Sequence, residues 1–180
     1  MRSKLIIFNG LPATGKSTLS RQVASIVQLP LVTKDSMKES LADALGLLDK
    51  KSSKIIGSVA AESLWTLTDR FLSEGRSLMI ENAFIEEYAT PDLKKITSKY
   101  EPLVLEIYCV CRPDIRRKRE HERIISAQRH PIHTENTLDT EEDELNKIYA
   151  PLKKGKFIEV NTTKPEQIKI VDIVSEIENL

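Results

Sequence analysis

The sequence predicts a three-layer α/β fold with five parallel strands, and two observations support this prediction. Short runs of β-branched and other apolar residues alternate along the chain with stretches of helical periodicity, which is typical of β-α-β units on a parallel sheet. The chain has 180 residues, of which 40% are apolar and 30% are charged, as in a globular domain. We therefore expect residues 1–180 to form a single domain of ordinary size.

The expected strands are short runs, and the fourth is almost entirely apolar, as expected of a strand covered on both faces. They span Lys4–Asn9, Leu31–Thr33, Ser77–Asn82, Leu103–Val110 and Phe157–Val160.

Helical periodicity occupies the segments between the strands. The first helix ends before Pro30, the second contains an awkward Gly46, and Gly75 follows the third at the position of a C-terminal cap. The expected helices span about Lys16–Gln28, Ser36–Leu48, Ile56–Phe71, Pro91–Tyr100, Pro113–Gln128, Thr140–Ala150 and Pro165–Glu178.

Composition narrows the range of functions. The 27 basic and 27 acidic residues cancel, so the chain lacks the basic footprint of a protein that coats nucleic acid. Uninterrupted apolar runs such as Leu5–Phe8 are far shorter than the roughly 20 residues of a membrane span. We expect a cytosolic protein without membrane association. Cys109 and Cys111 suit neither a disulfide framework nor a zinc ribbon, and small buried side chains are the simpler interpretation.

The most specific motif is a phosphate-binding loop at Gly10–Ser17, which matches the pattern G-x-x-x-x-G-K-[ST]. A hydrophobic strand precedes it and an amphipathic helix follows it, as the motif requires. Its glycines allow several backbone N–H groups to point into one concavity, where phosphate oxygens bind. Lys16 would contact the β- and γ-phosphates, and Ser17 would ligate Mg²⁺. The expected nucleotide-binding residues are Gly10, Leu11, Pro12, Ala13, Thr14, Gly15, Lys16, Ser17 and Thr18.

The loop alone does not separate switch GTPases, motor ATPases and small-molecule kinases. A GTPase would need an N-K-x-D motif, and Asn161–Lys164 lacks its aspartate. The D-x-x-G switch motif is also absent after the third strand, at Glu81–Phe84. The chain is short for a motor or remodelling ATPase, so a kinase is the favoured class.

Two acidic residues follow strands at the carboxyl edge of the sheet, where ligands bind in α/β folds. Asp35 follows the second strand and is either a general base and Mg²⁺ ligand or the N-cap of the next helix. Glu81 ends the third strand and is either a Mg²⁺ or water-positioning group or an ordinary surface charge.

The helix after the fourth strand carries a row of arginines on one face: Arg112, Arg116, Arg119 and Arg123. Because stacked like charges repel, the row favours a lid, at about residues 112–135, that closes over phosphates and excludes water. A solvated basic face is the alternative. The neighbouring His130 and His133 do not indicate zinc, since the chain has three histidines and no paired cysteines.

This order of landmarks resembles the P-loop kinases of the nucleoside-kinase-like group, from residue 4 to about residue 135. Within that group, the loop and the Arg129–His133 segment resemble AAA-type ATP-binding kinases, which are similar to the chloramphenicol phosphotransferases, zeta toxins and polynucleotide kinases. Many relatives have Asp at the position of Glu81, and several place an Arg near Lys34 and Asp35.

The resemblance implies a kinase that uses ATP and Mg²⁺. By position, Asp35 would be the general base, Arg116 and Arg119 catalytic lid arginines, and Arg112, Asn161 and Thr162 further nucleotide-binding residues. Ser17, Asp35 and Glu81 would hold the metal.

The favoured activity is transfer of the γ-phosphate of ATP·Mg²⁺ to a hydroxyl of a small molecule. The acceptor pocket would lie between the helices after the second and third strands, near Met37, Leu41, Trp65 and Phe84, although Trp65 is also suited to the core. A 5′-hydroxyl nucleic-acid kinase is disfavoured by the zero net charge and the 5% aromatic content. A nucleotide-binding regulator or toxin-like protein with little turnover remains a third possibility. The sequence does not indicate the oligomeric state.

Overall fold

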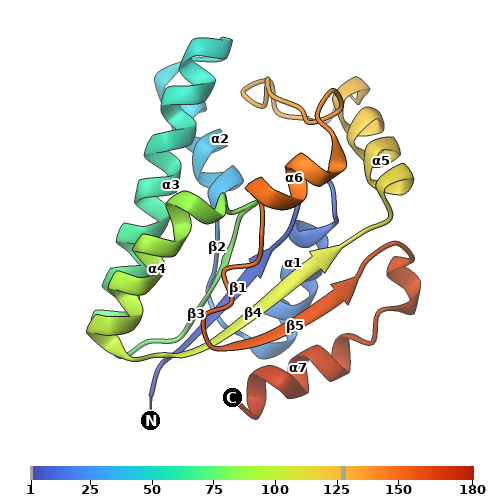
Figure 1. The fold of residues 1–180 in the computed structure, drawn as a ribbon. Helices are drawn as coiled ribbons and strands as arrows, with labels where there is room; N and C mark the ends of the chain where they lie inside the picture. The colour runs from blue at the N-terminus through green and yellow to red at the C-terminus, as the bar shows by residue number, and fades with distance from the viewer. Residues whose placement is uncertain (1, 127–128) are drawn as a thin grey trace.

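A five-stranded parallel sheet in the order β2-β3-β1-β4-β5 forms the centre of the computed structural model, which describes residues 2–126 and 129–180 (Figure 1). The strands are β1 Lys4–Asn9, β2 Leu31–Thr33, β3 Leu78–Glu81, β4 Leu103–Val110 and β5 Lys156–Asn161. All four neighbouring pairs are parallel. The predicted three-layer α/β architecture with five parallel strands is confirmed.

Helices cover both faces of this sheet. They are α1 Lys16–Val27, α2 Lys34–Leu45, α3 Lys50–Ser73, α4 Glu86–Tyr100, α5 Pro113–Ile125, α6 Glu142–Ile148 and α7 Ile170–Glu178. The side chains of β1 alternate between two cores: Leu5 and Ile7 pack with α3 and α4, whereas Ile6 and Phe8 pack with α1 and α7. This alternation is the two-residue period of a strand buried on both faces.

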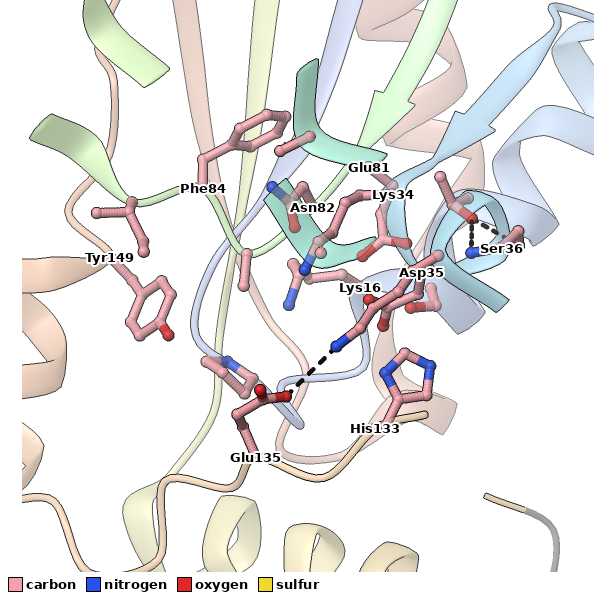
Figure 2. A pocket seen from close by; sticks show the side chains of 18 of the residues that line it. Lys16, Lys34, Asp35, Ser36, Glu81, Asn82, Phe84, His133, Glu135 and Tyr149 are labelled. Carbon is pink, nitrogen blue, oxygen red and sulfur yellow. Dashed lines mark hydrogen bonds and ion pairs between the residues drawn. The ribbon is translucent and has the colours of Figure 1, made fainter. Parts of the chain in front are cut away.

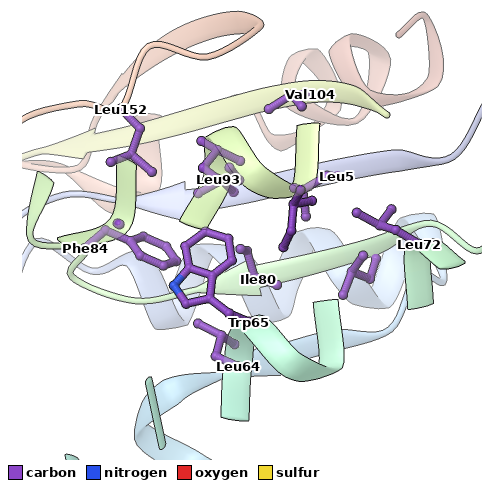
Figure 3. Packing of buried hydrophobic residues seen from close by; sticks show 13 residues of the cluster. Leu5, Leu64, Trp65, Leu72, Ile80, Phe84, Leu93, Val104 and Leu152 are labelled. Carbon is purple, nitrogen blue, oxygen red and sulfur yellow. The ribbon is translucent and has the colours of Figure 1, made fainter. Parts of the chain in front are cut away.

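The core under α3 and α4 reaches the carboxyl edge of the sheet (Figure 3). Trp65 of α3 packs against Phe84, which follows β3, with ring centroids 5.6 Å apart. Both residues are buried, and both also line the cavity described below. The expected core role of Trp65 therefore coexists with a position at the wall of the pocket.

Several helix boundaries differ from the sequence-based expectation. α2 begins at Lys34, because the Thr33 hydroxyl accepts a hydrogen bond from Ser36 N at 3.2 Å and caps the helix. It ends at Leu45, so that Gly46 is its C-cap rather than an interior residue. α4 begins at Glu86 and contains Pro91. A short 3₁₀ turn at Pro165–Gln167 precedes α7, and the end predicted for α5, near position 128, lies outside the described residues.

A buried polar network fixes the end of β1. The Asn9 side chain accepts hydrogen bonds from Gly10 N at 2.7 Å and Phe84 N at 3.1 Å, and it donates to Glu106 Oε1 at 2.9 Å. The Glu106 carboxylate on β4 also accepts from Leu152 N and Lys153 N at 3.0 and 2.7 Å. Asn9 and Glu106 are almost completely inaccessible to solvent. These two side chains therefore join four segments at the point where the loop after β1 begins.

Glu106→Gln tests this network, because the amide places N–H donors where the carboxylate accepts three hydrogen bonds. Leaving buried donors unpaired costs about 1–3 kcal/mol, and we expect the free energy of unfolding in urea to fall by that amount. The matched control is Glu159→Gln on the exposed face of β5, which should change it by about 0.5 kcal/mol at most. Equal stability of the two variants would contradict the structural role of Glu106.

Candidate active site

The loop Gly10–Ser17 connects β1 to α1, as its sequence predicts. A Cβ atom at Gly10 would lie 2.3 Å from the backbone oxygen of Cys109, and Gly10 has a φ of 132°. Gly15 forms the N-cap of α1 with a φ of 89°. Only glycine satisfies both positions, since a side chain at Gly10 would displace the loop from β4. The N-terminus of α1 thus presents a backbone cradle of the kind that binds phosphate.

Lys16 is buried inside this loop. Its ammonium donates to the Leu11 carbonyl at 2.9 Å, and the Thr14 hydroxyl donates to the same oxygen at 2.8 Å. Burial lowers the pKa of Lys16, and the charge of Glu81 partly counteracts this effect. A phosphate group would offer the ammonium a stronger, negatively charged partner than the carbonyl it now contacts.

Glu81 lies at the end of β3, buried next to Lys16. Burial raises the pKa of Glu81 above its ordinary value, whereas the Lys16 charge and a hydrogen bond from Ser17 lower it. Glu81 is only 4% exposed, so it is not an ordinary surface charge. Mg²⁺ is usually bound through one or two carboxylates, substrate phosphates and retained waters, and a Ser17 hydroxyl beside a Glu81 carboxylate fits that donor set.

Asp35 is the second residue of α2 and faces the same cavity (Figure 2). Thr33 caps α2, so the alternative interpretation of Asp35 as the N-cap is wrong. Burial alone would raise the pKa of Asp35, but His133 in its protonated form and the positive charges of Lys34, Lys16 and Arg123 outweigh this effect and hold the pKa below its ordinary value. Asp35 is therefore a carboxylate at neutral pH.

The loop and Asp35 share a cavity of about 980 Å³ at the carboxyl edge of the sheet. Figure 2 shows Lys16, Asp35, Glu81 and Asn82 at one side of it, with Tyr149 and Glu135 across from them. The cavity continues along α3 to Trp65. It is therefore larger than a cradle for phosphates alone.

Two arginines of α5 line this cavity. Arg119 donates to the backbone oxygens of Thr162 and Thr163 at 2.9 and 3.1 Å, and its Nη1 lies 3.9 Å from the position of a Cβ atom at Gly15. Arg123 lies 3.7 Å from the Asp35 carboxylate. The sequence placed Arg123 in the arginine row of the expected lid but not among the catalytic or nucleotide-binding residues, and the structure brings it to the cavity wall.

Arg116 does not lie where the sequence-based prediction placed it. Its guanidinium is completely buried and contacts Glu120 at 3.0 Å, Glu142 at 2.8 Å and the Thr137 hydroxyl at 2.9 Å. It is absent from the cavity wall. Because its donors are already paired with carboxylates and a hydroxyl, Arg116 joins α5 to α6, and this position does not support the catalytic role expected from the resemblance.

Other expected nucleotide contacts also lie outside the cavity wall. Arg112 is exposed and pairs with Asp114, and the Asn161 side chain accepts from Thr163 N at 2.9 Å. Thr162 is buried, and its hydroxyl donates to the backbone oxygens of Thr14 and Val110. Thr162 thus contacts the phosphate loop on the side that faces away from the cavity and helps to hold it in place.

The segment 129–137 covers the cavity from the side of α2 and α3. His133 Nε2 lies 2.7 Å from a Glu39 oxygen, and the side chain of Ile132 is fully buried between the two helices, with Ala42 and Ile56. Burial lowers the pKa of His133, with an opposing effect of Asp35. The described residues contain no group of three His, Cys, Asp or Glu side chains that could hold a metal.

Only part of the expected acceptor pocket lies at the cavity. Trp65 and Phe84 line it, whereas Met37 faces a separate groove on the outside of α3 and Leu41 packs near Ile132. Sequence reasoning missed Lys34, Lys38 and Tyr88, all of which line the cavity, because helical periodicity does not show which polar face turns inward.

Comparisons with known proteins agree with this geometry. Residues 5–146 match the family model described as "AAA domain", and the chain belongs to that family. A protein from Chloroflexus aurantiacus J-10-fl, named only as a candidate kinase, is 32% identical, with a TM-score of 0.87 over 99% of this chain and 98% of its own. A comparison with curated proteins gave no match.

More distant structures share the fold alone. Shikimate kinase from Acinetobacter baumannii, solved with shikimate, is 16% identical, with a TM-score of 0.57 over 98% of this chain and 92% of its own. Kti12 from Chaetomium thermophilum, solved with ADP-AlF3, is 14% identical, with a TM-score of 0.62 over 97% of each chain. The chain is a P-loop NTPase of the kinase-like group. In the described part of the chain, no helix has the length and apolar character needed to cross a bilayer.

Arg116→Ala tests the structural role of Arg116. It leaves Glu120, which is 5% exposed, as a buried charge without its guanidinium partner, and such losses cost about 3–5 kcal/mol. We expect the free energy of unfolding to fall by that amount, measured by chemical denaturation. Lys118→Ala, on the exposed face of α5, is the control and should change it by about 0.5 kcal/mol at most. An Arg116→Ala variant of wild-type stability would contradict the structural role of Arg116.

Proposed function

We propose that this protein is a phosphotransferase that moves the γ-phosphate of ATP·Mg²⁺ to a hydroxyl group of a small molecule. The observation that carries the proposal is the single cavity shared by the phosphate loop and the ionised Asp35, with further space along α3 beyond the loop. A protein that only binds and releases a nucleotide needs the phosphate loop. It does not need a carboxylate base next to a further part of the cavity that extends beyond the loop.

Each group has a role that follows from its position. The acceptor oxygen forms a bond to the γ-phosphorus while the bond from that phosphorus to the β–γ bridging oxygen breaks, and ADP leaves with that oxygen. Lys16 and the backbone N–H groups of the loop hold the phosphates in line and stabilise their charge. Mg²⁺, held by Ser17 with Glu81 and Asp35 nearby, would neutralise charge on the phosphate oxygens.

Asp35 would accept the proton of the attacking hydroxyl. A base must be ionised and within hydrogen-bond reach of the proton it removes, directly or through one water. The cations around Asp35 keep it ionised, and its position on the first turn of α2 places it between the phosphate loop and the rest of the cavity.

Asp35→Asn keeps the shape of the side chain and removes the base. We expect the turnover number to fall by about 10²–10⁴, with ATP affinity little changed. Asp69→Asn on α3, outside the cavity, should keep full activity. The readout is ATP-dependent phosphorylation across a panel of small alcohols, which includes sugars and shikimate because a sugar kinase and a shikimate kinase share the fold. Wild-type turnover by the Asn variant would exclude Asp35 as the base.

We further propose that the segment at about residues 112–135 acts as a lid. Residues 127–128 of this segment lie outside the described residues. Arg119 and Arg123 line the cavity from α5, so bound phosphates would draw this segment inward. Amides in this segment should exchange hydrogen more slowly with a non-hydrolysable ATP analogue and Mg²⁺ than without nucleotide, whereas those of α7 should not change. Identical exchange in both states would show that the segment does not respond to nucleotide.

A further inference from the structure

Two lysines of α2 converge on one point of the cavity wall. A Cβ atom built at Gly57 of α3 would lie 3.7 Å from the Lys38 ammonium and 3.9 Å from the Lys34 ammonium. Lys34 and Lys38 stand four residues apart, so they occupy the same face of the helix. Lys34 reaches into the same cavity as Asp35 and Glu135 (Figure 2).

The two ammonium groups differ in how their charge is balanced. Lys38 is 3% exposed, donates to the Ser53 hydroxyl at 2.7 Å and pairs with Glu135 at 3.3 Å. Lys34 makes no ion pair with any of residues 2–126 and 129–180. Burial lowers the pKa of Lys38, and the neighbouring Lys34 charge lowers it further against the effect of Glu135. The two ammonium charges oppose each other, and an anion bound between them would offset this repulsion.

The facing helix leaves room for such an anion. Along α3 the cavity wall carries Ser53, Gly57 and Ala61 at four-residue spacing, before the large Trp65. Glycine inside a helix is less favourable than alanine, so a glycine here is explained if the space left by the missing side chain is used. The space it leaves lies directly beside the two ammonium groups.

The acidic residues of the cavity offset this charge only in part. The Asp35 carboxylate interacts with both ammonium groups, so that three cations, Lys34, Lys38 and Lys54, face Asp35 and Glu135 at this end. Glu39 pairs with His133 and Glu135 pairs with Lys38. Glu62 lies more than a helical turn beyond Gly57 along α3. There it is close to Asp92, whose pKa is raised mainly by burial and also by the charge of Glu62. Exposed Lys54 adds a further cation on the Gly57 side. The cavity therefore has a positive end at Gly57 and a negative end toward α4.

We propose that the acceptor carries an anionic group, a carboxylate or a phosphate, which binds between Lys34 and Lys38 over Gly57. This rests on the proposed kinase function and defines its substrate class. Asp35 is three residues before Lys38, and the Cβ atoms of residues at this helical spacing lie about 5–6 Å apart. The acceptor is therefore a compact alcohol whose hydroxyl and anionic group are separated by a few bonds.

Binding of simple anions tests the site without knowledge of the acceptor. With ADP·Mg²⁺ filling the phosphate loop, inorganic phosphate and acetate are titrated separately, and binding is followed by calorimetry. Lys34→Gln should weaken binding of the preferred anion at least about tenfold, since a charge-assisted hydrogen bond is lost. Gly57→Leu should also block it, by filling the space. Lys51→Gln, an exposed lysine of α3 outside the cavity, is the control and should bind as wild type.

The same variants are then compared as enzymes on matched acceptors: hydroxy acids against their methyl esters, and phosphorylated alcohols against the parent alcohols. We expect turnover only with anionic members, and Lys34→Gln should raise their KM at least about tenfold, whereas the control Lys51→Gln should leave it at the wild-type value. Preference for carboxylates or for phosphates identifies the anion.

Equal phosphorylation of neutral and anionic members, or anion binding that Lys34→Gln and Gly57→Leu leave intact, would overturn this inference while the kinase function stands. Loss of anion binding in both variants without phosphorylation of any alcohol would support the anion site and count against the kinase function.

Discussion

The side chain of Asn9 is the contact on which the site depends. It sits at the last residue of β1 and is bonded to the first amide of the phosphate loop, to the segment after β3 and to Glu106 on β4. Because buried polar groups are costly unless they are all paired, this network has one low-energy arrangement. The loop therefore leaves the sheet in a defined direction, at a fixed distance from the strand end that carries Glu81.

Charged side chains are concentrated at this edge of the sheet, in positions suited to bind the phosphates of a nucleotide. Lys16 and Glu81 are buried side by side, and each opposes the effect of burial on the other's pKa. Lys16 is held by the Leu11 carbonyl, a neutral partner that phosphate oxygens can replace. Around this pair, Asp35, Arg119 and Arg123 face the cavity from α2 and α5, so the groups that would act on a transferred phosphate come from both sides of the loop.

The sequence predicted the parts of the structure that depend on local pattern. The five strands, the phosphate loop and the position of Glu81 follow from residue type and period, since carboxyl ends of parallel strands share one edge. Long-range pairing was not predictable. Arg116 and Arg119 belong to one arginine row, yet only Arg119 lines the cavity. Arg116 is buried in a contact with Glu142, which lies 26 residues further along the chain. Likewise, the convergence of Lys34 and Lys38 on Gly57 requires the packing of α2 against α3.

The most direct test of the central claim is a crystal structure with a non-hydrolysable ATP analogue and Mg²⁺. The account predicts that the β- and γ-phosphates lie on the loop, that the Lys16 ammonium leaves the Leu11 carbonyl to contact them, and that Asp35 faces the γ-phosphate from the side of the open acceptor cavity. A nucleotide whose phosphates lie off the loop, or whose γ-phosphate is separated from Asp35 by protein, would contradict it.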